Sequence, residues 1–128
     1  MSAYVQISFG ELVDKITILE IKAARVTDAT KLAHVRHELA VLLAVWTPLE
    51  QDAAEVGAVR DELKAVNERL WQIEDSIREK EAGQRFDAEF IALARAVYQT
   101  NDRRFALKSR INALLDSGVV EQKHYAQY

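Results

Sequence analysis

The stretch from 90 to 115 constrains the fold most, because it reads as one long helix whose apolar stripe is interrupted. At about 100° per residue, the following apolar side chains gather on one side: Phe90, Leu93, Ala94, Val97, Phe105, Ile111 and Leu115. Two cations and two amides fall in the middle of the same side: Asn101, Arg104, Lys108 and Asn112. Burying a lone charge is costly, so these groups need partners inside the fold or a ligand.

Helical periodicity extends over most of the rest of the chain. It predicts four main helices, near residues 8–26, 29–46, 50–82 and 87–117. Ser8 with Glu11, and Thr47 with Glu50, have the spacing of capping boxes, which mark helix starts. One proline and four glycines in 128 residues also favour a helical chain. We therefore expect an all-α fold, an antiparallel bundle of these four helices.

The remaining segments predict how the chain begins and ends. Gly83 and Gly118 are expected to stop the two long helices. Residues 4–7 predict a short N-terminal extended segment, and residues 119–128 an irregular C-terminal arm. The length suits one domain over residues 1–128.

Three of the predicted helices present polar groups at or beside the core. The candidate ligand-binding residues are Glu20, Asn67, Trp71, Glu74, Arg78, Asn101, Arg104 and Lys108. We expect Arg104 and Lys108 to be buried and to meet Glu20 or Glu74 through charge-assisted hydrogen bonds. Two interpretations stay open. The groups form a structural network whose long side chains reach outward, or they line a pocket in which cations hold an anionic ligand beside Trp71.

Several classes of site are disfavoured by composition. The chain has no cysteine, which excludes disulfides and thiolate zinc sites. His34 and His37 share a helix face, but no carboxylate-histidine pair on a second helix supports a metal, and we expect no metal and no cofactor. A formal net charge of −3 argues against general nucleic-acid binding. Neither a glycine-rich phosphate loop nor a catalytic set can be named.

Apolar side chains outside the expected core predict whether the protein self-associates. Ile18 and Ile21 on the first predicted helix, and Val41 and Val45 on the second, lie opposite the expected core faces. Such patches are unusual on a monomer, so we expect a homodimer.

The first ten residues lack a signal-peptide pattern, and the longest apolar run, 39–46, is shorter than the ~20 residues of a membrane span. We expect a cytoplasmic protein without membrane insertion.

Three stretches of the chain, residues 8–22, 66–75 and 98–104, together with residues 121–125, resemble signature stretches of a known family. It is a small, all-helical bacterial family of unknown function. The resemblance implies a bacterial protein, sometimes associated with glycosyltransferases or envelope-polysaccharide genes. It implies no established activity, so no catalytic residue is carried over.

Two hypotheses for function follow. The first is a non-enzymatic module that binds a partner protein or an anionic small molecule, for example in surface-glycan assembly. The second is a small all-α enzyme that acts on an anionic metabolite through core cations, as all-helical chorismate mutases do. Glu11 and Asp14 are also similar to the acidic helix motif of nucleotide pyrophosphohydrolases, although the further acidic pairs of that family are missing. The enzyme hypothesis requires a cavity into which polar groups from several helices converge. If Glu20, Arg104 and Lys108 pair with one another and no cavity lies beside them, that hypothesis loses most of its support.

Overall fold

The computed structural model describes residues 1–49 and 54–128. It contains the helices α1 (Phe9–Arg25), α2 (Ala29–Trp46), α3 (Ala54–Ala82) and α4 (Ala88–Leu114). No strand occurs in the described ranges, so the prediction of an all-α bundle is confirmed. The predicted start of the third helix at residue 50, and with it the Thr47–Glu50 capping box, lies outside the described residues.

Helix starts are set by side chains that accept hydrogen bonds from the first turn. The Ser8 hydroxyl accepts from the backbone N–H of Glu11 at 3.1 Å, as its capping box predicts. Asp28 and Asp87 do the same for α2 and α4, at 2.9 and 3.0 Å. Each cap satisfies a backbone donor that has no partner within the helix.

Helix ends differ in detail from the predicted glycine stops. The left-handed residues that close α3 and α4 are Gln84 and Asp116, each with φ of 51°, and no glycine has positive φ. After α3, the N–H of Arg85 donates to the carbonyl oxygen of Lys80 at 2.9 Å. This is a Schellman motif, and it places Gly83 one residue before the left-handed position.

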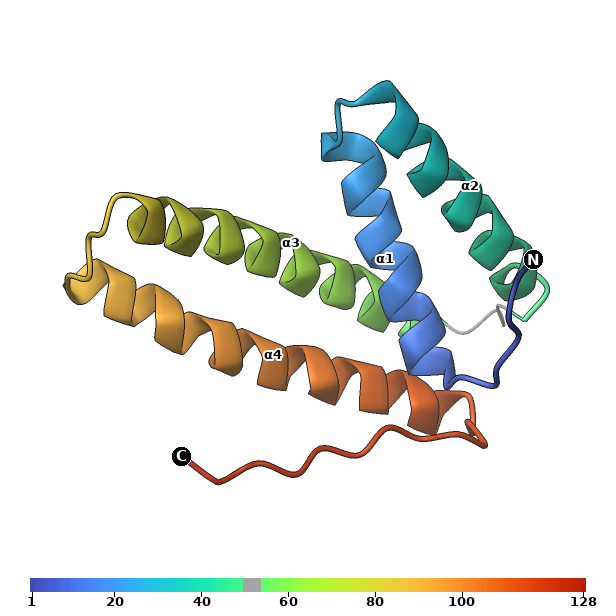
Figure 1. The fold of residues 1–128 in the computed structure, drawn as a ribbon. Coiled ribbons are helices and arrows are strands. Elements are labelled where there is room, and N and C mark those ends of the chain that lie inside the picture. The colour runs from blue at the N-terminus through green and yellow to red at the C-terminus, as the bar shows by residue number, and fades with distance from the viewer. Residues whose placement is uncertain (50–53) are drawn as a thin grey trace.

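The helices pack as two unequal pairs (Figure 1). α3 and α4 lie side by side over their length, and α1 and α2 form a shorter pair. α1 contacts both long helices near the end where α3 begins and α4 ends, and α2 packs on the outer side of α1. The far ends of α3 and α4 therefore extend beyond α1.

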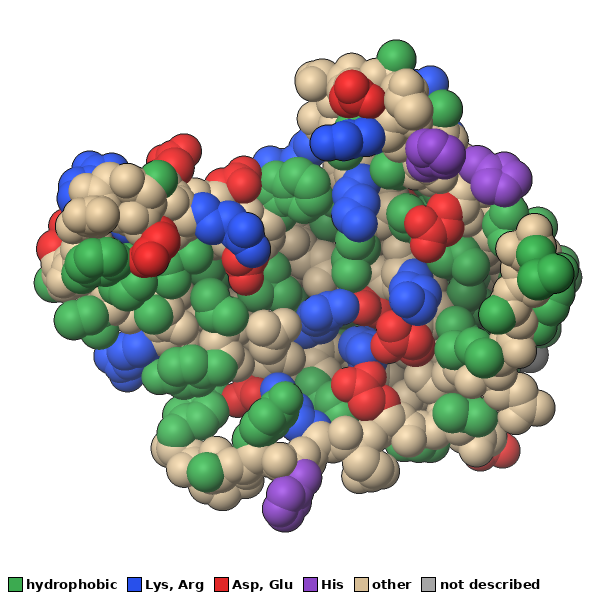
Figure 2. All heavy atoms as spheres, in the orientation of Figure 1, with side chains coloured by type: hydrophobic (Ala, Val, Ile, Leu, Met, Phe, Trp, Pro, Cys, Tyr) green, Lys and Arg blue, Asp and Glu red, His purple; other side chains and the backbone are tan. Residues whose placement is uncertain are grey.

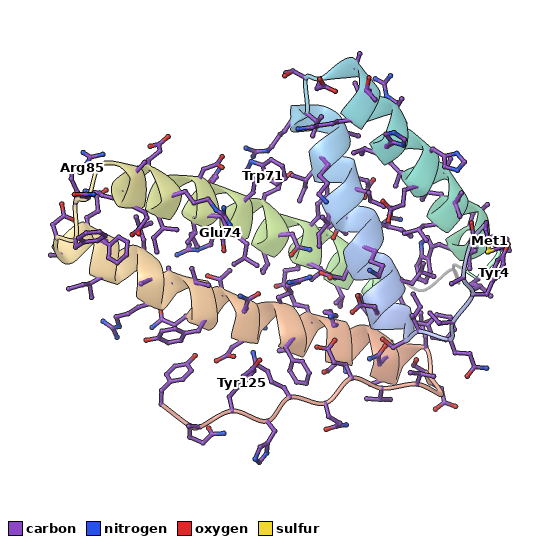
Figure 3. The ribbon with its side chains drawn as sticks, viewed as in Figure 1. Met1, Tyr4, Trp71, Glu74, Arg85 and Tyr125 are labelled. Carbon is purple, nitrogen blue, oxygen red and sulfur yellow. The ribbon has the colours of Figure 1, made fainter. Side chains whose placement is uncertain are left out.

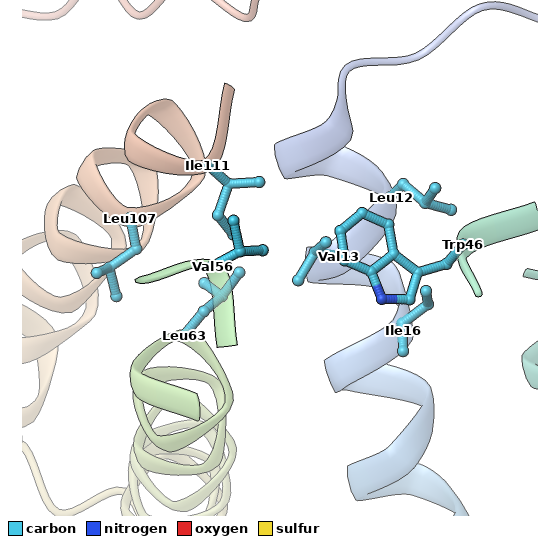
Figure 4. Packing of buried hydrophobic residues seen from close by; sticks show 8 residues of the cluster. All are labelled: Leu12, Val13, Ile16, Trp46, Val56, Leu63, Leu107 and Ile111. Carbon is cyan, nitrogen blue, oxygen red and sulfur yellow. The ribbon is translucent and has the colours of Figure 1, made fainter. Parts of the chain in front are cut away.

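The apolar core lies where α1 meets the base of the long pair (Figure 4). Its buried members are Leu12, Val13, Ile16, Trp46, Val56, Leu63, Leu107 and Ile111. They come from all four helices, so this cluster joins the two pairs. Within the described ranges, no helix combines the length and the apolar character that a bilayer crossing requires.

The predicted dimer patches have different outcomes. Ile21 is only 3% exposed and Ile18 is partly buried, so the prediction of an outer apolar patch on the first helix is wrong. Both isoleucines line a hollow that α3 and α4 close. Val41 and Val45 remain half exposed on α2. The homodimer stays a prediction.

Gly10 allows the closest approach of α1 to α4. A Cβ atom at this position would lie 2.3 Å from the carbonyl oxygen of Lys108 and 3.0 Å from Oδ1 of Asn112. The same Asn112 oxygen accepts a hydrogen bond from the Gly10 N–H at 2.7 Å. Only glycine fits between these two helices without a backbone shift.

We expect Gly10→Ala to destabilise the fold by about 1–3 kcal/mol, because the added methyl group forces α1 away from α4. Gly57→Ala is the matched control. No described atom lies within 4 Å of a Cβ built at Gly57, and alanine in a helix gains up to about 1 kcal/mol over glycine. Urea unfolding of both variants measures the free energies. Equal effects of the two substitutions would contradict the close approach.

Candidate functional site

An ion pair between a half-buried arginine and a buried carboxylate joins α4 to α1. The Asp14 side chain is 1% exposed, and Arg104 binds it with two parallel hydrogen bonds. Nε of Arg104 donates to Oδ1 at 2.9 Å, and Nη2 donates to Oδ2 at 2.5 Å. These hydrogen bonds raise the pKa of Arg104 above its ordinary value. A paired, bidentate arrangement is what allows a carboxylate to be buried here.

Asn67 brings α3 into the same network. Its Nδ2 donates to Oδ1 of Asp14 and to the Thr17 hydroxyl, each at 2.9 Å. The Thr17 hydroxyl in turn donates to the backbone carbonyl of Asp14 at 2.8 Å. Asp14, Thr17 and Asn67 are all buried. Three helices are therefore tied together through one carboxylate.

Lys108 forms a second charged contact one turn further along α4. Its Nζ lies 2.7 Å from Oε2 of Glu11 and 2.6 Å from Oε2 of Glu121. Burial of the ammonium opposes its charge, but the hydrogen bonds to Glu11 and Glu121 outweigh burial and raise the pKa of Lys108 above its ordinary 10.5. Figure 2 shows basic side chains (blue) and acidic side chains (red) next to one another in the middle of the face in view.

The expected partners of these cations are wrong. Glu20 pairs with Arg60 at 3.4 Å, and Glu74 pairs with Arg78 at 3.2 Å along the surface of α3. Glu74 is 46% exposed at the surface of α3 and so does not reach the buried centre. For Glu20 the physical reason is its position along α1. Asp14 lies level with Arg104, whereas Glu20 lies further toward the end of α1, where that helix points away from α4 (Figure 1).

A pattern in the sequence does mark Asp14 as buried. It lies on a second face of α1, outside the core face that the apolar periodicity identified. Gly10, Asp14, Thr17 and Ile21 are spaced four, three and four residues apart, and all are buried. They form a second stripe on α1, because α2 covers one side of this helix and the long pair covers another. Glu121 follows α4 in an irregular segment, and no periodic pattern marks its position.

A groove of about 370 Å³ opens between α1, α3 and α4, beside the buried network. It is lined by Ile18, Ile21, Asn67, Leu70, Trp71, Glu74, Asp75, Asn101 and Arg104. Five of the eight candidate residues therefore share one hollow, and Glu20, Arg78 and Lys108 do not line it. Figure 3 shows Trp71 and Glu74 on α3, with Trp71 toward the upper part of α1. The Arg25 guanidinium lies 5.7 Å from the Trp71 ring centroid.

A second, larger hollow of about 1180 Å³ lies between α4 and the C-terminal segment. Asn101 and Arg104 line both hollows. Lys108 and Glu121 line only the second. Among the described residues, no group of three or more His, Asp or Glu side chains is arranged to hold a metal ion.

The fold and the site define an all-α protein in which a buried three-helix polar network forms one wall of an open groove. The chain belongs to a family of unknown function (DUF6165), whose model matches residues 3–128. The resemblance of its sequence stretches to an all-helical family of unknown function is thereby confirmed. No curated protein and no solved structure matches the chain.

Arg104→Met should destabilise the fold by about 3 kcal/mol, because it leaves the Asp14 carboxylate buried without its cation. Adding Asp14→Asn should recover much of this loss, because the amide removes the charge and keeps an acceptor for Asn67. Arg78→Met is the control, since its pair with Glu74 is exposed and should change stability by less than about 1 kcal/mol. Urea unfolding of all variants tests this. A double variant no more stable than the single one would contradict a dominant role of the charge.

The pKa of Lys108 predicts how stability changes at alkaline pH. Because this pKa is raised in the folded state, the contribution of Lys108 is fully present below pH 10.5 and is lost as the pH rises through the folded-state value. Urea unfolding from about pH 8 to about pH 11.5 should therefore show a stability gap between the wild type and Lys108→Met that narrows only above about pH 10.5. A gap that closes well below this pH would contradict the paired ammonium.

Proposed function

We propose that this chain is a non-enzymatic binding module and that the groove between α1, α3 and α4 holds a neutral, polyhydroxylated small molecule such as a sugar ring. One observation carries the proposal. Trp71 lines the groove together with the planar polar groups of Glu74, Asn101 and Arg104, and these residues come from two helices.

The residue types match the chemistry of a sugar. A sugar ring has apolar C–H faces and several hydroxyl groups, each both a donor and an acceptor. An aromatic ring covers the C–H face, while amide and carboxylate groups pair with the hydroxyls. No described residue hydrogen-bonds the Asn101 side chain, so its amide is available. The volume of about 370 Å³ suits a small ligand.

The charges in the groove favour a neutral ligand over the anion that the sequence first suggested. Asp14 neutralises Arg104 through two hydrogen bonds. Glu74 and Asp75 add two carboxylates to the lining, and Glu74 pairs with Arg78 at 3.2 Å. The charged residues in the described lining of the groove are thus two carboxylates and one arginine that is already paired, so no unpaired cation among them is present to hold an anion.

The paired cations also weigh against the enzymatic alternative. That hypothesis requires core cations that hold an anionic metabolite during its reaction. Arg104 is bound in a bidentate pair, and Lys108 contacts two carboxylates. Neither cation is held ready for a reacting group in the groove, so binding without chemistry is the better-supported function.

The two tryptophans make a direct binding test possible. Trp46 is fully buried in the core, whereas Trp71 lines the groove. Neutral mono- and disaccharides should shift the indole N–H signal of Trp71 in a proton–nitrogen NMR spectrum and leave that of Trp46 in place. Asn101→Ala should weaken this binding about tenfold, since it removes hydrogen bonds to the sugar. Phe86→Ala, an exposed aromatic outside the groove, should not change it.

Three panels distinguish the ligand classes in that experiment. Sugars, sugar phosphates and dicarboxylates are titrated separately at matched ionic strength. Shifts of Trp71 by dicarboxylates but not by neutral sugars would replace the sugar with an anion. An unmoved Trp71 signal with all three panels would refute the groove as a ligand site.

A further inference from the structure

The C-terminal arm, residues 119–128, follows α4 as an extended segment that runs back beside it (Figure 1). Its contact nearest the core is made by Glu121, which lies 2.6 Å from Nζ of Lys108. The Lys108 side chain is 8% exposed, whereas that of Glu121 is 42% exposed. A buried cation is thus covered by a carboxylate that water can reach.

The remaining contacts of the arm are also made by side chains at the surface of α4. Asp102 accepts hydrogen bonds from Lys123 and from the hydroxyl group of Tyr128. The Tyr128 ring packs edge-on against Tyr98, with centroids 5.1 Å apart. Tyr128 is 77% exposed. Lys123 is half-buried, with its Nζ 5.6 Å from the Phe105 ring centroid. Release of the arm therefore requires the loss of these few side-chain contacts, and none of them is in the apolar core.

The surface beneath Glu121 is suited to an anion. Arg104 and Lys108 lie one helical turn apart on α4 and line the same hollow. Asp14 engages Nε and Nη2 of Arg104, and no described residue accepts a hydrogen bond from Nη1. Without Glu121, Lys108 would keep one carboxylate, that of Glu11. Removal of Glu121 therefore opens one contact position on Nζ of Lys108, which another negative group could occupy.

We propose that Arg104 and Lys108 form an anion site in which Glu121 is an internal ligand, and that an external phosphate or carboxylate group competes with Glu121 and releases the arm. The exchange replaces one negative group with another, so the charge balance around Lys108 is kept. The proposal does not depend on what the groove between α1, α3 and α4 holds. Because Asn101 and Arg104 line both hollows, an anion here would lie next to the groove.

Titration with inorganic phosphate, followed by the amide signals of Lys108 and of the arm in NMR spectra, tests the competition. Glu121→Gln should bind phosphate about three- to fivefold more tightly than the wild type, because the competing carboxylate is gone. Glu62→Gln is the matched control. Glu62 also pairs with an arginine of α4, Arg103, but both side chains are 55% exposed and lie outside this hollow. It should leave phosphate binding unchanged.

Tyr128→Phe separates release of the arm from the local loss of a charge. It removes the hydroxyl that donates to Asp102, and it changes no charge at neutral pH. If the arm competes with the anion, this variant should also bind phosphate more tightly, about twofold. Phosphate should at the same time make the arm of the wild-type protein more mobile on the nanosecond timescale, which nitrogen relaxation measures.

A parallel titration with succinate distinguishes a carboxylate ligand from a phosphate. Tighter binding of phosphate or succinate by Glu121→Gln and Tyr128→Phe than by the wild type supports the site. The anion that binds more tightly identifies the chemical class of the ligand. The proposal is overturned if Glu121→Gln binds neither anion more tightly than Glu62→Gln does. It is also overturned if both anions bind without any change in the arm signals.

Discussion

The bidentate pair between Asp14 and Arg104 is the interaction on which the rest of this structure depends. A carboxylate with 1% exposure is tolerated only when its oxygens are satisfied, and here Arg104 of α4 and Asn67 of α3 both bind it. The pair therefore fixes the register of three helices at once. Gly10 reinforces it, because the absence of a side chain lets α1 approach α4 closely enough for the hydrogen bonds to form.

The same pair explains why a groove exists beside the core. α1 is held against α3 and α4 near one end, and the far ends of the long helices extend past it (Figure 1). Side chains at the point of divergence, Ile18 and Trp71 among them, are only partly covered. The structural and the ligand-binding interpretations are thus compatible, since a fully paired network is also the polar wall of the groove.

Two different chemistries meet along α4. On the side of α1 and α3, Trp71 and planar polar groups suit a neutral hydroxylated ring. On the side of the C-terminal arm, Lys108 holds Glu121 in a hollow suited to an anion. Asn101 and Arg104 belong to both sides. For a family of unknown function, this arrangement gives two binding hypotheses that separate variants can test.

The sequence by itself determined the helices and the polar character of the centre. Periodicity located all four helices, and the cap at Ser8 follows from local hydrogen bonding that needs no other part of the fold. It also placed Arg104 and Lys108 on the inner side of the last helix, where they are found paired.

Only the tertiary structure decided which residues pair with Arg104 and Lys108. Glu20 and Asp14 both belong to α1, and which of them meets Arg104 depends on where that helix crosses α4. That crossing is set by packing between residues about ninety positions apart, as in the Asp14–Arg104 contact itself, and no local pattern encodes it. Glu121 was still less predictable, because an irregular arm has no period, and its position depends on contacts with α4, among them the buried ammonium that it covers.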